Sequence, residues 1–400
     1  MERPNPFENN VVFDPREAER AVPELNERAL AILLRRFARL EAEPHPRRYR
    51  MNVKAQLILS PEPGYGKSHL IGRLFQALRG HASLIYLRPF QEPGSAWRSI
   101  LEKLVQEMDR PDDPSISVRR SMRPTQLDTF VEGAFGHLLA ELMEKDVVGG
   151  DYDPSLVRKL REDPSSAFGR EEDETVLGEW MREQGDFLLS LFAEELSTAD
   201  IALNTPASTW LSVLHAYCFG DGGKEKREAC LEWLKGERGW PKEDLPPNRT
   251  EAARNTAAFG RLQDFFVLAG LSKPFVLCFD QLELLMGNPE LVAEFGMVVD
   301  ELVTFGLNEM VVVAANIEPW RTVMEKNFQP AFRDRFSDPI TLKEIRQPQA
   351  LELARRRLTN AGMGEEEIAR FCNSGWLDSL FNGEQRLGAR DFLRLCEKRA

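Results

Sequence analysis

The stretch AQLILSPEPGYGKSHLIGRLF, residues 55–75, decides the fold class of this chain. Its first part, AQLILS (55–60), is a short apolar run that predicts a buried strand, and leucines at helical spacing follow it. The glycine-rich turn PEPGYGKS (61–68) stands between the two. Another apolar run, SLIYLRPF (83–90), completes a β-α-β unit. This order of elements predicts an α/β fold with a parallel sheet flanked by helices.

The turn PEPGYGKS has the residues expected of a phosphate-binding loop. Gly64 and Gly66 allow backbone N–H groups to face phosphate oxygens, and the helix that starts near Lys67 adds the positive end of its dipole. Lys67 supplies a positive charge for the terminal phosphates, and Ser68 is a ligand for Mg²⁺. The usual pattern begins with Gly where this chain has Pro61, so the loop starts with a fixed φ and one N–H fewer. We expect ATP and Mg²⁺ here, with cofactor contacts from Pro63, Gly64, Tyr65, Gly66, Lys67, Ser68 and His69.

A further apolar run, FVLCFDQLELL (275–285), ends its strand in Asp280. Phosphoryl-transfer enzymes present a carboxylate beside Mg²⁺ in this way, so we expect Asp280 and Ser68 to form the metal site. The next residue, Gln281, can hold a water molecule but cannot accept its proton. Glu283 can act as the base in its place, and the alternative is that Glu283 is a solvated or ion-paired side chain.

Three more polar side chains are expected near the phosphates. Asn316 ends the strand MVVVAAN (310–316), and its amide can reach the terminal phosphate or the attacking water; the alternative is a turn-forming Asn. Arg333 and Arg335 precede a short strand-like segment, and Arg335 is our candidate for a side chain that projects into a neighbouring subunit's site, the alternative being a surface residue. Arg390 starts the last predicted helix, from which a closing lid can direct its guanidinium at the phosphates.

Apolar periodicity indicates a parallel sheet that is interrupted by a long helical insertion and followed by an all-α lid. The loop PEPGYGKS makes the expected sheet one of the P-loop type. The apolar stripes of the insertion are expected to form its own core rather than a cofactor pocket. Within it, the acidic stretch 163–179 is expected to be a solvated loop. The expected units are an N-terminal helical lead-in (1–50), two parts of the α/β core (51–94 and 271–343), the insertion (95–270) and the lid (344–400).

The charge of the chain limits its partners. A formal net charge of −12 argues against a protein that coats nucleic acid with its whole surface, because phosphate binding needs clustered Lys and Arg. Local basic clusters at RRYR (47–50) with Lys54, at SVRRSMRP (117–124) and at RRR (355–357) leave DNA as a candidate partner. Charge runs of this size are usually solvated faces, which is the alternative.

Cysteine usage and the absence of targeting signals indicate the compartment. The five cysteines show no C-x-x-C spacing and form an odd set, so neither a zinc site nor a disulfide framework is indicated. The first residues, MERPNPFENN, lack the apolar centre of an export signal. No run approaches the roughly 18 apolar residues that a membrane span needs. We therefore expect a cytoplasmic protein with reduced thiols and no membrane partner.

Read in order, PEPGYGKS, VLCFDQLE, VVVAAN, RDRF and GARDFLRLC resemble the Walker A, Walker B, sensor 1, arginine-finger and sensor 2 segments of AAA+ ATPases. The likeness covers about 51–90 and 270–400, and the ending is similar to the origin-recognition and STAND branch. WLKGE (233–237), with the D-Q-x-E strand end, is similar to bacterial ATP-binding proteins of phage-defence islands such as the BREX type. About 210 residues separate the two Walker segments, far more than is usual in the family.

The resemblance implies an ATP hydrolase that works as a homo-oligomer on an effector protein partner or on DNA, in antiviral defence. The alternative function is an ATP-binding switch or scaffold that oligomerises, recruits an effector and hydrolyses slowly or not at all, which Gln281 favours. The catalytic residues implied are Lys67, Asp280, Gln281, Glu283, Asn316 and Arg335, with Arg390 as a further cofactor contact.

Overall fold

The computed structural model describes residues 5–8, 14–17, 22, 25–42, 54–112, 124–148, 154–168, 176–199, 201–221, 223–241, 250–381 and 387–400. Its centre is a five-stranded sheet in the order β2-β3-β4-β1-β5, and every described pairing in it is parallel. The expected α/β fold with a parallel sheet flanked by helices is confirmed. The strands are β1 (Gln56–Ser60), β2 (Ser83–Leu87), β3 (Phe275–Phe279), β4 (Glu309–Asn316) and β5 (Ile340–Thr341).

Strands β1 to β4 are buried along their whole length, because helices cover both faces of the sheet. Alternate side chains point to opposite faces. One face carries residues such as Leu57, Ile85 and Leu277, and the other carries residues such as Ile58 and Cys278. Continuous apolar runs in the sequence therefore correspond to strands that are enclosed on both sides.

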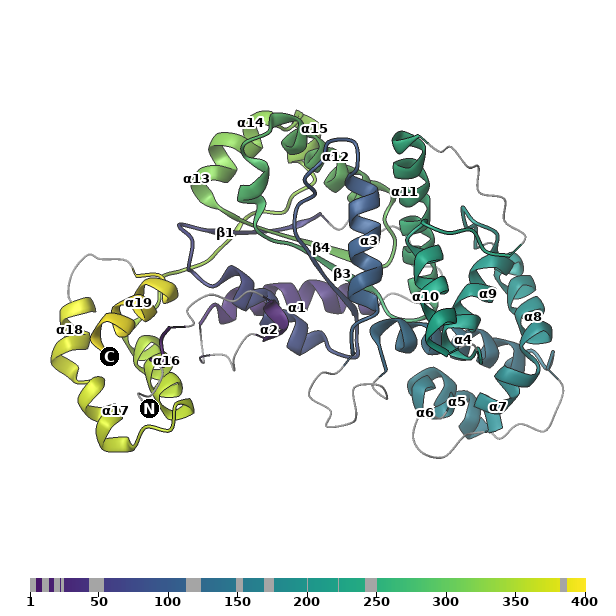
Figure 1. The fold of residues 1–400 in the computed structure, drawn as a ribbon, viewed down its shortest axis with the longest axis horizontal. Helices are drawn as coiled ribbons and strands as arrows, with labels where there is room; N and C mark the ends of the chain where they lie inside the picture. Colours follow the sequence, from purple (N-terminus) through teal and green to yellow (C-terminus); the bar gives the residue numbers. More distant parts are fainter. Residues whose placement is uncertain are drawn as a thin grey trace.

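Helices α1 (Glu27–Glu41) and α2 (Lys67–Leu78) cover one face of the sheet (Figure 1). Helices α3 (Ala96–Met108) and α12 (Pro289–Phe305) belong to the other face. Helix α12 starts where its sequence favours a start, since the Asn288 side chain accepts the backbone N–H groups of the first turn and a proline follows. The sheet and its two helical layers make a three-layer α/β core.

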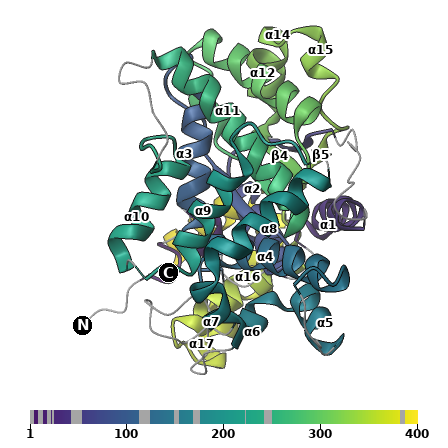
Figure 2. The same cartoon turned by 90° about the vertical axis from the view of Figure 1, so that its right-hand side faces the viewer.

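The segment between β2 and β3 is helical, as its periodicity predicts, and Figure 2 looks onto these helices. Its apolar stripes form a hydrophobic core, as expected, but this core is continuous with one face of the sheet rather than separate. Trp210 packs edge-on against both Trp233 and Phe265, and Phe265 packs edge-on against Phe275 of β3. After α3, the helices are α4 (Gln126–Glu144), α5 (Pro154–Glu162), α6 (Pro164–Phe168), α7 (Val176–Glu183), α8 (Gly185–Thr198), α9 (Ala207–Cys218), α10 (Gly223–Leu234) and α11 (Glu251–Leu268).

The acidic stretch 163–179 is more structured than its composition indicates. Helix α6 and the start of α7 fall within it, and Ala167 and Phe168 are buried. The ring of Phe168 packs edge-on against Phe219 at a centroid distance of 5.4 Å. Two apolar residues in a polar context are enough to dock this short helix, so a solvated loop is the wrong description of its described part. Residues 169–175 lie outside the described residues.

The C-terminal helices form a small unit, as predicted, with α16 (Gln347–Asn360), α17 (Glu365–Phe371), α18 (Ser374–Phe381) and α19 (Ala389–Arg399). Figure 1 shows it beside the sheet, at the opposite end of the molecule from α4 to α9. Residues of the N-terminal lead-in, Phe7, Val22 and Leu25, are buried in its core. The lead-in therefore packs with the C-terminal unit, while α1 packs on the sheet.

Short helical turns connect β4 to β5: α13 (Ile317–Pro319), a π-helical turn (Trp320–Met324), α14 (Glu325–Asn327) and α15 (Pro330–Arg333). Three-residue and four-residue 3₁₀ turns occupy Pro15–Glu17, Ala269–Leu271 and Leu282–Leu285. The turn at Leu282–Leu285 follows β3 directly and carries Glu283. Its position at the end of a central strand places it beside the candidate site.

Candidate functional site

The carboxyl ends of β1, β3 and β4 meet at one edge of the sheet, which is where ligands bind in open α/β folds. Ser60 at the end of β1 pairs in register with Asn316 at the end of β4. The Ser60 hydroxyl donates to Asn316 Oδ1 at 2.9 Å. Asp280 follows β3, the next strand. The strand order thus brings together polar residues that are more than two hundred positions apart in the chain.

The loop between β1 and α2 has the backbone that its glycines predict. Gly64 and Gly66 have φ values of 99° and 89°, the left-handed region that glycine enters without strain. Gly66 is the N-terminal flanking residue of α2, so the helix dipole points at the loop. The Asn26 side chain, at the start of α1, donates to the Tyr65 carbonyl at 3.1 Å. Two helices therefore hold this turn in a shape suited to a polyphosphate.

Lys67 lies at the centre of the polar cluster. Its ammonium group donates to Asn316 Oδ1 and, at 3.1 Å, to Ser60 Oγ, and it lies 3.9 Å from Glu283 Oε1. Burial lowers the pKa of Lys67 from its ordinary 10.5; Glu283 and Asp280 oppose the shift and the positive charge of Arg390 adds to it. Bound phosphates would raise this pKa again, so the site favours an anion beside this group.

Ser68 and Asp280 are positioned as a pair. The Ser68 hydroxyl donates to Asp280 Oδ2 at 2.6 Å, and the Tyr86 hydroxyl donates to the same oxygen at 3.1 Å. Burial raises the pKa of Tyr86, and the Asp280 charge raises it further. Mg²⁺ prefers hard oxygen ligands and keeps several waters, so a hydroxyl and a carboxylate at this spacing suit it. The donor set predicted from the sequence is thus present in one place.

Gln281 and Glu283 differ in their geometry. Gln281 has a φ of 62°, and its backbone N–H donates to Asp280 Oδ1 at 2.9 Å. A left-handed glutamine directly after Asp280 is a strained conformation of the kind that clusters at functional sites. Glu283 directs its carboxylate towards Lys67, and its side chain is 35% exposed. Of the two, only Glu283 can accept a proton.

Arg390 joins the C-terminal unit to the loop. Its backbone N–H donates to the Gly64 carbonyl at 3.1 Å, and a Cβ on Gly64 would lie 2.7 Å from Arg390 Cβ. Arg390 Nε is buried and has no hydrogen-bond partner among the described residues. A buried guanidinium nitrogen without an acceptor, close enough to Lys67 to act on its pKa, fits an anionic ligand between the two.

The other residues predicted for the site lie outside the cluster around Lys67. Pro63 is exposed, and His69 is half-buried in the first turn of α2. Arg335 lies at the opposite edge of the sheet, where its carbonyl accepts from Ala55 at 2.8 Å just before β1. Its Nε donates to Asp300 Oδ1 on α12 at 2.6 Å. Arg335 is therefore not brought to the site of its own chain, and a role in a neighbouring subunit stays a prediction.

The basic clusters are only partly described. Residues 47–50 and 117–123 lie outside the described residues. On α16, Arg355 is exposed, whereas Arg356 and Arg357 are half-buried and Arg356 Nε donates to Glu352 at 2.6 Å. The run 355–357 therefore does not form one continuous basic face.

Sequence reasoning missed Ser60, Tyr86 and Asn26. The signal for Ser60 was a polar residue at the end of an apolar strand, next to the loop. Tyr86 could not be assigned to Asp280 because the neighbour of β2 in the sheet is not encoded in local periodicity. Asn26 precedes α1, and its contact with the loop depends on how α1 packs on α2.

No model of a known protein family matches this chain, and no curated protein matches it either. In the part of the chain that the structure describes, no helix is both long enough and apolar enough to cross a membrane. Four of the five cysteines are buried and Cys218 is half-buried. The assignment of function therefore depends on the geometry of the site.

Proposed function

We propose that this chain binds Mg²⁺ and ATP as a P-loop protein and hydrolyses ATP. The observation that supports this most is the convergence of Lys67, Ser68, Asp280 and Asn316 at the carboxyl edge of the sheet, in front of a turn with two left-handed glycines. A cation, a hydroxyl, a carboxylate and an amide around one turn form a set that recognises a metal-bound polyphosphate.

The chain supplies four groups for the phosphates and two for the metal. Backbone N–H groups of the loop and the α2 dipole face the phosphates, and Lys67 neutralises their charge. Arg390, from the C-terminal unit, supplies a second positive charge from the other side. Ser68 and Asp280 would hold Mg²⁺, which withdraws charge from the phosphate oxygens when it is bound.

Glu283 is the proposed general base. Its carboxylate lies in the site beside Lys67, and Asn316 presents an amide that can orient a water molecule. Gln281, in the position directly after Asp280, cannot take a proton. If Glu283 acts only as the ion-pair partner of Lys67, the site has no general base. The glutamine at position 281 then favours the second candidate function, an ATP-binding switch with slow or no hydrolysis.

We further propose an AAA+ ATPase of the origin-recognition or STAND-like branch, acting as a cytoplasmic homo-oligomer with an effector protein or DNA, in antiviral defence. Its support is the order of motifs together with the position of Arg335, which is 33% exposed on the side of the sheet away from its own loop. The proposed role of an arginine placed there is to act at the site of another subunit. Leu284, next to Glu283, is 60% exposed and would be covered in such an assembly.

Phosphate release from ATP separates the two candidate functions. Steady release by the wild-type chain, abolished in Lys67→Ala and kept in Lys54→Ala, supports hydrolysis. Lys54 is the control because it is exposed just before β1, away from the loop. ATP that stays bound without any release of phosphate supports the ATP-binding switch. Release that continues in Lys67→Ala would contradict both.

A further inference from the structure

A cleft of about 720 Å³ lies beside the candidate nucleotide site, and Tyr86 contributes to both. The residues that follow β2, one side of α3, and Asp14 line it. Tyr86 is a wall of this cleft and also donates its hydroxyl to Asp280. The residues that line the cleft do not include the loop 61–68. The cleft is therefore adjacent to the nucleotide site and distinct from it.

Cationic side chains outnumber acidic ones on the walls of the cleft. Arg88, Lys103 and Arg110 line it, against the acidic residues Asp14 and Glu92. Asp14 pairs with Arg110, whose Nη1 lies 2.5 Å from its carboxylate, so these two residues together add no net charge to the cleft. Its pKa is lowered: burial alone would raise it, but hydrogen bonds and the charges of Arg16 and Arg110 outweigh burial. With Arg16 and Glu107 behind the wall included, four cationic groups stand against three carboxylates, so a negative ligand would meet a net positive charge.

A buried carboxylate holds two of these cations in place. Glu107 is 1% exposed and lies behind the wall, with Lys103 Nζ 3.2 Å and Arg110 Nε 3.1 Å from its Oε1. Arg16 Nη1 lies 2.5 Å from the other carboxylate oxygen. An ammonium has three N–H donors, so one ion pair with Glu107 leaves Lys103 donors for a ligand. Because these ion pairs already fix the cationic side chains, less conformational entropy is lost when a ligand binds.

Neutral donors and rings complete the walls. Ser99 adds a hydroxyl and Gln91 an amide, and Phe90 and Tyr86 add aromatic rings. A volume of about 720 Å³ falls in the range of sites for small molecules, roughly 300 to 1,000 Å³. Cations, hydroxyl donors and rings in one cleft are the groups that recognise a phosphorylated small molecule.

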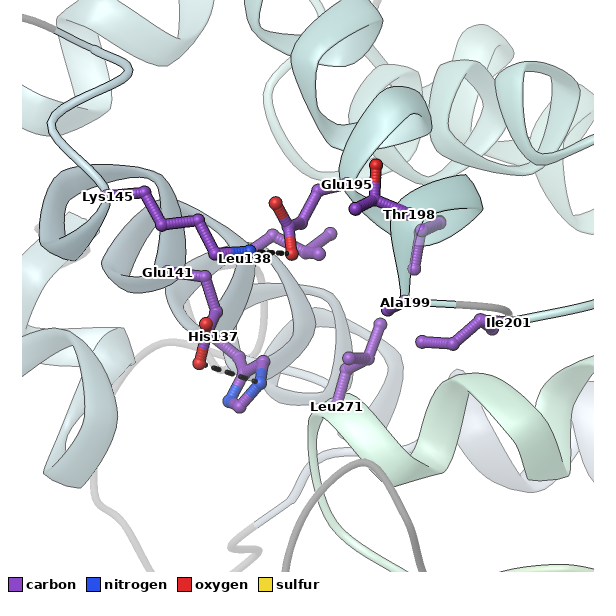
Figure 3. Close-up of a pocket in the computed structure, with 10 residues that line it drawn as sticks. His137, Leu138, Glu141, Lys145, Glu195, Thr198, Ala199, Ile201 and Leu271 are labelled. Atoms are coloured by element: carbon purple, nitrogen blue, oxygen red, sulfur yellow. Dashed lines mark hydrogen bonds and ion pairs between the residues drawn. The ribbon is translucent and has the colours of Figure 1, made fainter.

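We propose that this cleft is a second ligand site, for a phosphate-bearing small molecule. A second cavity, of about 220 Å³ between α4 and α8, does not share this chemistry (Figure 3). Its charged walls carry Glu141 and Glu195 against Lys145, and Lys145 already pairs with Glu195 at 2.5 Å. That cavity is smaller and more acidic, so a phosphate compound selects the cleft beside Tyr86.

Calorimetric titration with inorganic pyrophosphate tests the proposal in the full chain. The Lys67→Ala background removes the lysine of the proposed nucleotide site, so remaining pyrophosphate binding that depends on Arg88 is assigned to the cleft. Lys67→Ala is expected to bind one pyrophosphate. Adding Arg88→Gln weakens this binding by about tenfold or more, because it removes a charged donor. Adding Ser99→Asp, which places a negative charge on the wall, has the same effect.

The matched control is Arg98→Gln in the same background. Arg98 is on α3 like Lys103, but it does not line the cleft, and its Nη1 lies 2.9 Å from Glu251 Oε1. The substitution Arg98→Gln removes the same charge as Arg88→Gln. Pyrophosphate binding stays within about twofold in this control. Equal weakening in Arg88→Gln and Arg98→Gln, or no pyrophosphate binding to Lys67→Ala, overturns the proposal. If the loop is not a nucleotide site, the wild type and Lys67→Ala bind the same amount, while the Arg88 effect persists.

Discussion

Gly64→Ala tests whether the C-terminal unit closes on the loop. A Cβ at this position meets Arg390 Cβ at 2.7 Å, and φ is +99°, so the substitution combines backbone strain with a clash. The strain of a left-handed alanine is about 1–2 kcal/mol, and overpacking adds about 1–3 kcal/mol. Since Arg390 must move, we expect ATP affinity to fall by about tenfold or more, as for a lost charged hydrogen bond.

Gly80→Ala is the control for strain alone. Its φ is +79°, and a Cβ there meets no described atom within 4 Å. We expect Gly80→Ala to lower the free energy of unfolding in urea by about 1–2 kcal/mol while its ATP affinity, measured by calorimetry, is unchanged. Gly64→Ala should lose more stability and lose affinity as well. Equal losses of stability and ATP affinity in the two variants, or full ATP affinity in Gly64→Ala, would refute the contact between the C-terminal unit and the loop.

Three further outcomes follow from the site. Glu283→Gln should stop phosphate release while ATP binding is kept, and unchanged release would remove Glu283 from the mechanism. Burial lowers the pKa of Lys67 in the free protein, and bound phosphates raise it again. ATP affinity should therefore fall as the pH rises through the pKa of Lys67 in the free protein, by up to about tenfold per pH unit. Lys67→Arg, which keeps its charge, should flatten this pH profile. Arg335→Ala should lower turnover by about tenfold or more without changing ATP affinity, because the proposed role of its guanidinium is at the site of a neighbouring subunit. Arg333→Ala is its control, and equal turnover in the two variants would contradict this role.

The sequence predicted the parts of the site that depend on local pattern. Apolar runs that end in a polar residue identified the ends of β3 and β4, and a glycine-rich turn between strand and helix identified the loop. Carboxyl ends of parallel strands share one edge, so Asp280 and Asn316 had to lie near Lys67 once all three strands joined one sheet. The described geometry agrees with that reasoning.

Features that depend on long-range packing could not be predicted. The hydrogen bond between Tyr86 and Asp280 requires β2 to lie beside β3, across an insertion of nine helices in the described residues. The shared core of insertion and sheet depends on aromatic contacts such as that of Phe265 with Phe275. The ion pair of Arg335 with Asp300 depends on the docking of α12. Periodicity reports which face of an element is apolar, but not what covers it.

Calorimetric titration of the full chain with ATP, with and without Mg²⁺, tests the central claim most directly. The account predicts saturable binding that is tighter with Mg²⁺, is lost in Lys67→Ala, and loses its dependence on Mg²⁺ in Asp280→Asn. An absence of ATP binding by the wild-type chain, or identical binding by all three proteins, would contradict it.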